Sequence, residues 1–82
     1  MELKITRLNK VATDNSLRAY VDIEYYGLQV LGCRIVEGSR GLFVSMPREK
    51  SKDGKFYDIC RFNDITIKKE FEDRILDEYK KI

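Results

Sequence analysis

Alternating apolar and polar residues predict that the first three quarters of the chain form short β-strands. The clearest segment is Leu17–Tyr25, where one set of alternate residues is apolar and the other set is mostly charged. A strict period of two is typical of a strand with one buried face. Leu3–Val11 shows a weaker form of the pattern, and its apolar phase slips between Ile5 and Leu8, which predicts a β-bulge.

Three further segments are predicted to be strands. Leu28–Val36 alternates, with Leu31, Cys33 and Ile35 on one face and Val30 on the other. A short apolar strand follows and is ended by the only proline, because proline has no N–H for the ladder. Asp53-Gly54 is a hairpin signal before the last strand. These last two strands are Leu42–Met46 and Phe56–Cys60. Short strands joined by short turns predict an antiparallel meander.

The tail is predicted to be helical from Asn63 or Asp64, either of which can act as N-cap. Apolar residues recur there at spacings of about four, as in a helix that packs one face on a sheet. They are Ile67, Phe71, Ile75, Tyr79 and Ile82. We therefore expect one α+β domain over residues 1–82, with an antiparallel sheet of about five strands in 1–62 and one C-terminal helix in 63–82.

The residue types present argue against catalysis. The chain of 82 residues has no histidine, which removes histidine bases and histidine-ligated metals. Cys33 and Cys60 are two ligands short of a zinc site unless a dimer supplies the others. The carboxylates are dispersed, and only Asp53 and Asp58 come close across the predicted hairpin. We expect no catalytic residues, no metal, no cofactor and no small-molecule substrate, and a minimal hydrolase is only a minor alternative.

The composition also indicates the cellular compartment in which the protein is expected. No apolar run approaches the roughly 20 residues needed to span a bilayer, and the start has no signal-peptide pattern. Two cysteines are too few for a disulfide scaffold, so we interpret them as reduced thiols. We therefore expect a cytoplasmic protein with no membrane partner.

A basic segment follows the proline and offers the clearest binding chemistry. Lysine and arginine side chains on an exposed loop can neutralise phosphates. The candidates are Arg40, Arg48, Lys50, Lys52, Lys55 and Arg61, with Lys68 and Lys69 as a flanking patch. Tyr57 is the candidate for base stacking, whereas Phe56 is expected in the core. The alternative is a solvated loop, which the opposite charges at Glu49 and Asp53 favour.

The central part of the chain resembles the SpoVG family (stage V sporulation protein G) in the order and spacing of its residues. The resembling segments are Ile35-Val36-Glu37-Gly38, Gly41-Leu42-Phe43-Val44-Ser45-Met46-Pro47 and Asp53-Gly54-Lys55-Phe56-Tyr57-Asp58-Ile59. The similarity continues at both ends, in Ile5-Thr6-Arg7-Leu8, Leu17-Arg18-Ala19-Tyr20 and Ile75-Leu76-Asp77-Glu78-Tyr79. It covers nearly the whole chain.

The resemblance implies a small bacterial cytoplasmic regulator that forms a homodimer and binds DNA or RNA. It implies effects on septation, sporulation, or surface and virulence gene expression. Nucleic-acid contacts in the family are attributed to basic residues after the Met-Pro pair, which correspond here to Arg48, Lys50 and Lys52. The chain departs from the family at residues 60–64, where the usual His-Pro segment is replaced and Arg61 adds a positive charge. The competing hypothesis is a protein-interaction module in cell division that uses a sheet edge or helix face.

Overall fold

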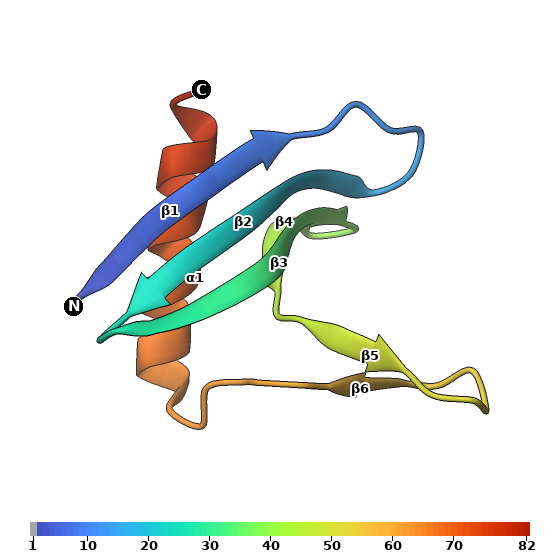
Figure 1. The fold of residues 1–82 in the computed structure, drawn as a ribbon. Helices are drawn as coiled ribbons and strands as arrows, with labels where there is room; N and C mark the ends of the chain where they lie inside the picture. Colours follow the sequence, from blue (N-terminus) through green and yellow to red (C-terminus); the bar gives the residue numbers. More distant parts are fainter. Residues whose placement is uncertain (1) are drawn as a thin grey trace.

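The computed structural model describes residues 2–82, which form two antiparallel β units and one helix. The elements are β1 (Leu3–Lys10), β2 (Leu17–Tyr25), β3 (Leu28–Gly38), β4 (Gly41–Ser45), β5 (Arg48–Lys50), β6 (Phe56–Asp58) and α1 (Ile65–Lys80). Strands β1 to β4 pair in chain order into one sheet, and β5 and β6 form a separate ribbon. The helix crosses one face of the sheet (Figure 1). The predicted α+β class is confirmed, although the strands divide into four and two.

The core lies between the inner face of the sheet and α1. Ala19, Val21 and Ile23 of β2 are fully buried, as the alternation in Leu17–Tyr25 predicts. From the helix, Phe71 and Ile75 complete this layer. The predicted apolar stripe of the helix is therefore confirmed at its centre, whereas Ile82 at its end is 58% exposed.

Asp64, one of the two predicted N-cap residues, is the N-cap of α1. Its Oδ1 accepts hydrogen bonds from the N–H groups of Thr66 at 2.9 Å and Ile67 at 3.2 Å. A side-chain oxygen at this position satisfies donors that have no partner within the helix. Just before the cap, the Phe62 ring packs on Phe71 with ring centroids 4.9 Å apart. These contacts fix the point at which the chain returns to the sheet.

The register of the sheet shifts at three points, one of which lies between Leu17 and Ala19 at the start of β2. Only the shift in β1 was predicted. The register of β1 shifts between Ile5 and Arg7, which confirms the expected slip. In β3, Asp22 lies opposite two residues, Leu31 and Gly32. Gly32 has φ of 86° and donates its N–H to Asp22 Oδ1 at 2.9 Å.

The bulge at Leu31 and Gly32 corrects the predicted faces of β3. The extra residue moves Leu31 to the outer face, where it is 62% exposed, and brings Val30 against the core. The expected grouping of Leu31 with Cys33 and Ile35 is therefore wrong. A bulge reverses which residues face inward on one side of it. A prediction that continues one alternation through Gly32 therefore assigns the residues before Gly32 to the wrong faces.

The basic segment after Pro47 is a strand in its first part, not a loop throughout. Arg48–Lys50 pairs with Phe56–Asp58, and residues 51–55 form the connection. The last predicted strand, Phe56–Cys60, is correspondingly two residues shorter. Within residues 2–82, no helix has the length and apolar character needed to cross a membrane.

Candidate nucleic-acid interface

The β5–β6 ribbon stands away from the sheet as an arm, which we define as residues 47–59 (Figure 1). Its base is closed by a hydrogen bond of 3.1 Å from the Ile59 N–H to the Pro47 carbonyl. Its tip is closed by a bond of 2.9 Å from the Ser51 N–H to the Lys55 carbonyl. The arm is thus a short hairpin held by its own backbone, and it presents the predicted basic residues to solvent.

The tip places two lysines around a turn organised by Asp53. The Ser51 hydroxyl donates to Asp53 Oδ1, and the Lys55 N–H donates to the same oxygen at 3.1 Å. These hydrogen bonds hold the pKa of Asp53 below its ordinary value. The carboxylate therefore shapes the turn, while the side chains of Lys52 and Lys55 remain exposed.

Strand pairing separates the charges of the arm onto two faces. Arg48 lies opposite Asp58 and Lys50 lies opposite Phe56, while Glu49 lies opposite Tyr57. Because side chains alternate across a strand, Glu49 lies on the face opposite to Arg48 and Lys50. The carboxylate that offsets a basic residue is instead Asp58, whose Oδ1 is 3.1 Å from Arg48 Nε. Lys50 is therefore the basic residue of β5 that keeps its full charge available.

Both aromatic residues of the arm are exposed. Tyr57 is 55% exposed, in keeping with its proposed stacking role, and Phe56 is 61% exposed. The expectation that Phe56 belongs to the core is wrong, because the arm has no layer packed on its faces. Lys50 Nζ lies 5.9 Å from the centroid of the Phe56 ring, within the range of a cation–π contact. Rings and ammonium groups are thus presented together.

An open hollow of about 830 Å³ lies between the arm and the segment that leads to α1. Its lining includes Arg48, Phe56 and Tyr57 from the arm and Arg61 from the following segment. The structure therefore brings Arg61 to the same hollow as Arg48, although 12 residues separate them in the sequence. Basic and aromatic side chains at one concave surface suit a ligand that has both phosphates and flat rings.

Three of the predicted basic residues lie elsewhere. Arg40 occupies the β3–β4 turn, and the five residues of β4 separate it from the arm by about 17 Å of extended chain. Lys68 and Lys69 lie on α1, where they line a hollow with Glu72 and Asp73. The two carboxylates balance the lysine charges locally. The predicted basic set is therefore divided, and its concentrated part is the arm with Arg61.

Thiol and carboxylate chemistry is not gathered at the arm. Cys33 is fully buried, and its burial, with smaller effects of Cys60 and Asp22, raises the pKa of its thiol to about 12. The pKa of Cys60 is also raised, by partial burial and then by Asp58. Within residues 2–82, no three cysteine, aspartate or glutamate side chains come together as a metal site.

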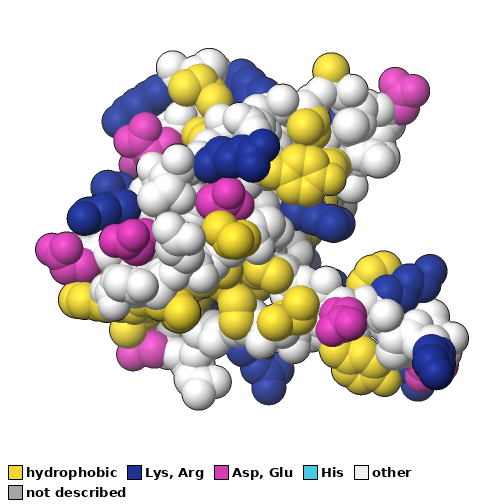
Figure 2. Space-filling model, viewed as in Figure 1, with side chains coloured by type: hydrophobic (Ala, Val, Ile, Leu, Met, Phe, Trp, Pro, Cys, Tyr) yellow, Lys and Arg dark blue, Asp and Glu magenta, His cyan; other side chains and the backbone are white. Residues whose placement is uncertain are grey.

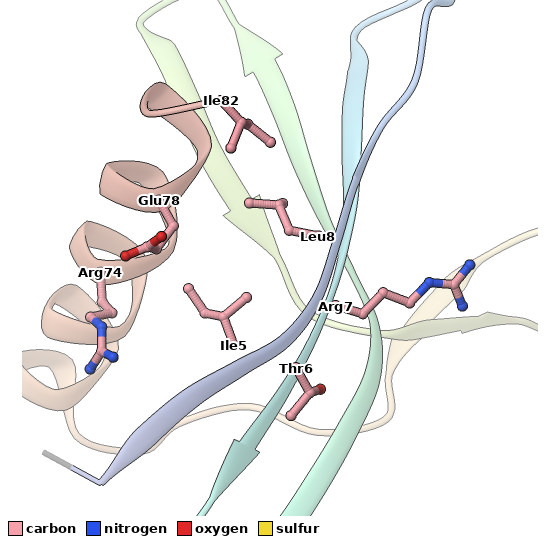
Figure 3. A pocket seen from close by; sticks show the side chains of 7 residues that line it. All are labelled: Ile5, Thr6, Arg7, Leu8, Arg74, Glu78 and Ile82. Atoms are coloured by element: carbon pink, nitrogen blue, oxygen red, sulfur yellow. The ribbon is translucent and has the colours of Figure 1, made fainter.

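A separate cleft of about 400 Å³ lies between the edge strand β1 and the end of α1 (Figure 3). Ile5 and Leu8 point into it toward Ile82, whereas Arg7 points to the other side of the strand. Lys10 Nζ donates to the Ile82 carbonyl at 2.8 Å and so ties β1 to the end of the chain. Sequence reasoning assigned Ile82 to the core and did not predict this cleft.

The face of the sheet opposite α1 is the second surface that sequence reasoning missed. In the view of Figure 1 the helix lies behind the sheet, and Figure 2 shows apolar side chains among charged side chains of both signs over the strands. Tyr20 and Phe43 on this face are 41% and 43% exposed. The signal was an aromatic residue, Tyr20, among the polar positions of Leu17–Tyr25.

Comparison with known proteins gives one family. The SpoVG family model matches residues 1–81. A protein of Clostridium perfringens (strain SM101 / Type A) named "Putative septation protein SpoVG" is 31% identical over 83 residues, covering all of this chain and 92% of that protein. The Bacillus subtilis (strain 168) protein of the same name is 34% identical, covering all of this chain and 86% of its own length. A third, from Symbiobacterium thermophilum, is 35% identical over 96% of this chain and 57% of its own length.

Proposed function

The chain belongs to the SpoVG family, and we propose that it is a bacterial regulator that binds DNA or RNA through the arm. Its relatives are named for septation, so we propose septation as the process it affects, with sporulation or surface and virulence gene expression as further readouts. The proposal is for a non-enzymatic, cytoplasmic protein. Its role would be to bind nucleic acid rather than to transform a substrate.

The observation that carries the proposal is the combination of charges and rings on the arm. Lys50, Lys52 and Lys55 lie within six consecutive residues, and none of them is in an ion pair within the described residues 2–82. Phe56 and Tyr57 follow directly and are both more than half exposed. Lysines supply phosphate contacts and exposed rings supply stacking, which together are typical of nucleic-acid-binding surfaces.

We further propose that two copies associate. A homodimer would present two arms, and joining two weak sites raises the overall affinity through effective concentration. The free edges of β1 and β4 are available for strand pairing in the four-stranded sheet. Sedimentation equilibrium tests this part of the proposal, and a single monomeric species at micromolar concentration would refute it.

The decisive experiment is a salt titration of an arm variant. Fluorescence anisotropy would measure the binding of labelled DNA and RNA by wild type and by K50A/K52A/K55A. Each lost phosphate contact removes about 0.9 from the slope of log K against log salt on duplex DNA, and about 0.7 on single strands. Between about 50 and 200 mM salt, wild type should therefore lose about 20- to 40-fold more affinity than the variant.

A matched control removes the same charge from another part of the molecule. K68A/K69A/K80A also deletes three exposed lysines, all of them on α1. It should keep the salt slope of wild type. Equal slopes for wild type and the arm variant would reject the arm as the phosphate surface, and a reduced slope in the helix variant would move the site to α1.

A second candidate function is a protein-interaction module, favoured by the cleft beside β1. Ile5, Leu8 and Ile82 are the apolar part of its lining, and Arg74 and Glu78 of α1 are charged. The cleft lies at the edge strand β1, the kind of place where a partner strand can add to a sheet. This hypothesis predicts negligible nucleic-acid binding in the same titration. It also predicts that a charge placed at Leu8 abolishes partner binding, whereas K50A/K52A/K55A does not.

A further inference from the structure

The face of β1–β4 opposite α1, which we call the open face, has side chains that the proposed arm contact does not use. The inner face contributes fully buried residues such as Val21 and Ile35. On the open face, Tyr20 and Phe43 are 41% and 43% exposed. Among the described residues 2–82, no helix covers this face of the sheet (Figure 1). Two aromatic rings on an uncovered sheet are available to stack with a ligand.

Register places these rings in neighbouring rows of the sheet. Tyr20 lies opposite Arg34, which lies opposite Ser45, and Phe43 lies opposite Val36 in the next row. The two rings are separated by two strand spacings across the sheet and by two residues along the strands, which together correspond to about 12 Å. That separation is too large for the rings to contact each other and is suited to two different bases of one strand.

Local packing holds each ring in place. The guanidinium of Arg34 lies 5.8 Å from the centroid of the Tyr20 ring. The Phe43 ring lies over Gly38, where an added Cβ would be 3.0 Å from Phe43 Cε1. The absence of a side chain at Gly38 therefore leaves the space that one edge of the ring occupies. Rings that are already positioned lose little entropy when a base stacks on them.

Most charges on the open face are balanced, and Arg34 beside Tyr20 is the exception. Toward the start of β1, Lys4 lies opposite Glu24 and Arg7 lies opposite Asp22. Around the rings, Arg34 has two uncharged register partners, whereas Arg18 is paired with Glu37 at 3.3 Å. Asp22 lines the groove beside Tyr20. Arg40 lies in the turn between Gly38 and Gly41. Arg34 and Arg40 are therefore the residues of this region that could contact an anionic ligand.

Two shallow grooves connect the open face with the arm. One, of about 390 Å³, runs along Tyr20, Leu31 and Gly32, and the other, of about 460 Å³, continues from Leu31 to Arg48 and Phe56. The grooves share Leu31 and Gly32 at the β3 bulge. A ligand that lies along them would pass from the sheet to the arm without leaving the surface.

We infer that the open face binds unpaired bases of single-stranded nucleic acid, with stacking on Tyr20 and Phe43 and phosphates near Arg34 and Arg40. The inference rests on the proposed function and specifies the form of the ligand. A duplex keeps its bases stacked inside, so the rings would recognise only a strand whose bases are free. A second copy of the chain on this face would place a second Arg34, which has no charged register partner, on the same surface. A purely apolar partner would leave Arg34 without a counter-charge.

Single-ring variants provide the first test. Y20L and F43L keep an apolar side chain and remove the flat ring, whereas Y20F keeps the ring. Oligo(dT) and oligo(rU) of about 12 nucleotides, within the usual site sizes, are the single-stranded probes, and a hairpin duplex is the control probe. Each ring loss should weaken single-strand binding by about 5- to 10-fold, the lower part of the range for base stacking. Y20F should bind as wild type does.

A fluorescence reporter provides an independent test, since the chain contains no tryptophan. Y20W and F43W would each place one reporter on the open face. I65W would place one at an exposed position on the helix, where Ile65 is 82% exposed. Stacking of a base should quench the reporters at positions 20 and 43 with single strands and leave the reporter at position 65 unchanged.

The outcomes separate this inference from the proposed function. If Y20L/F43L binds single strands as wild type does while K50A/K52A/K55A loses affinity, the open-face inference is wrong and the arm proposal stands. If wild type binds no nucleic acid, both are wrong. Equal quenching by duplex and single strand would overturn the preference for unpaired bases. Conversion of a dimer to a monomer by Y20L/F43L would show instead that the open face is a subunit interface.

Discussion

Replacing Gly32 with alanine should destabilise the protein through backbone strain alone. Gly32 has φ of 86°, and a Cβ added there would meet no atom within 4 Å. The cost is therefore not a clash but the left-handed conformation, which disfavours a non-glycine residue by about 1–2 kcal/mol. For a domain of this size, the melting temperature should fall by about 4 to 16 °C. Thermal unfolding followed by circular dichroism measures the fall.

Two further variants make this reasoning refutable. Gly32→Asn should cost less than Gly32→Ala, because asparagine tolerates positive φ better than other residues. Gly54→Ala imposes a similar strain at φ of 85°, but in the arm, so it should disturb the tip with little change in the main transition. A Gly32→Ala protein as stable as wild type, or one equal to Gly32→Asn, would show that strain at the bulge does not limit stability.

Two other predictions concern the core. Phe71→Ala removes a 1%-exposed ring that packs on Phe62 and should cost about 3–5 kcal/mol in urea unfolding; a loss below about 1 kcal/mol would contradict the assigned core. Because burial raises the pKa of Cys33 from 9.0 to about 12, the unfolded chain loses this proton first as the pH rises. The unfolding free energy should thus fall by about 1.4 kcal/mol per pH unit between these values; Cys33→Ala should lack this fall, and identical pH slopes would exclude the effect.

Sequence patterns predicted the fold where one face of an element is buried. The alternation of Leu17–Tyr25 and the stripe through Phe71 and Ile75 both report packing on a common core. The strand Arg48–Lys50 escaped prediction because all three of its residues are charged and exposed. It is a strand because of its pairing with Phe56–Asp58, and that pairing leaves no mark on hydrophobic periodicity.

The sequence predicted which residues belong to the candidate site but not how they are grouped in space. Lysines and arginines after Pro47 were visible in the sequence, yet their grouping depends on the path of the chain. The return of the chain beneath the arm brings Arg61 to the hollow, and the length of β4 keeps Arg40 away from it. Glu49 seemed to weaken the basic segment, but the pairing puts it on the other face and gives Asp58 that role.

The arm is energetically separate from the core, and this separation decides how binding variants should be interpreted. Every fully buried core residue comes from β1 to β4 or from α1, and none comes from residues 47–59. The arm is anchored at Pro47 and Ile59 by one backbone hydrogen bond, and Phe62 then fixes the chain against the helix. Substitutions of exposed lysines in the arm therefore remove no core contact. A loss of nucleic-acid affinity in these variants, at unchanged unfolding free energy, would report the binding surface itself.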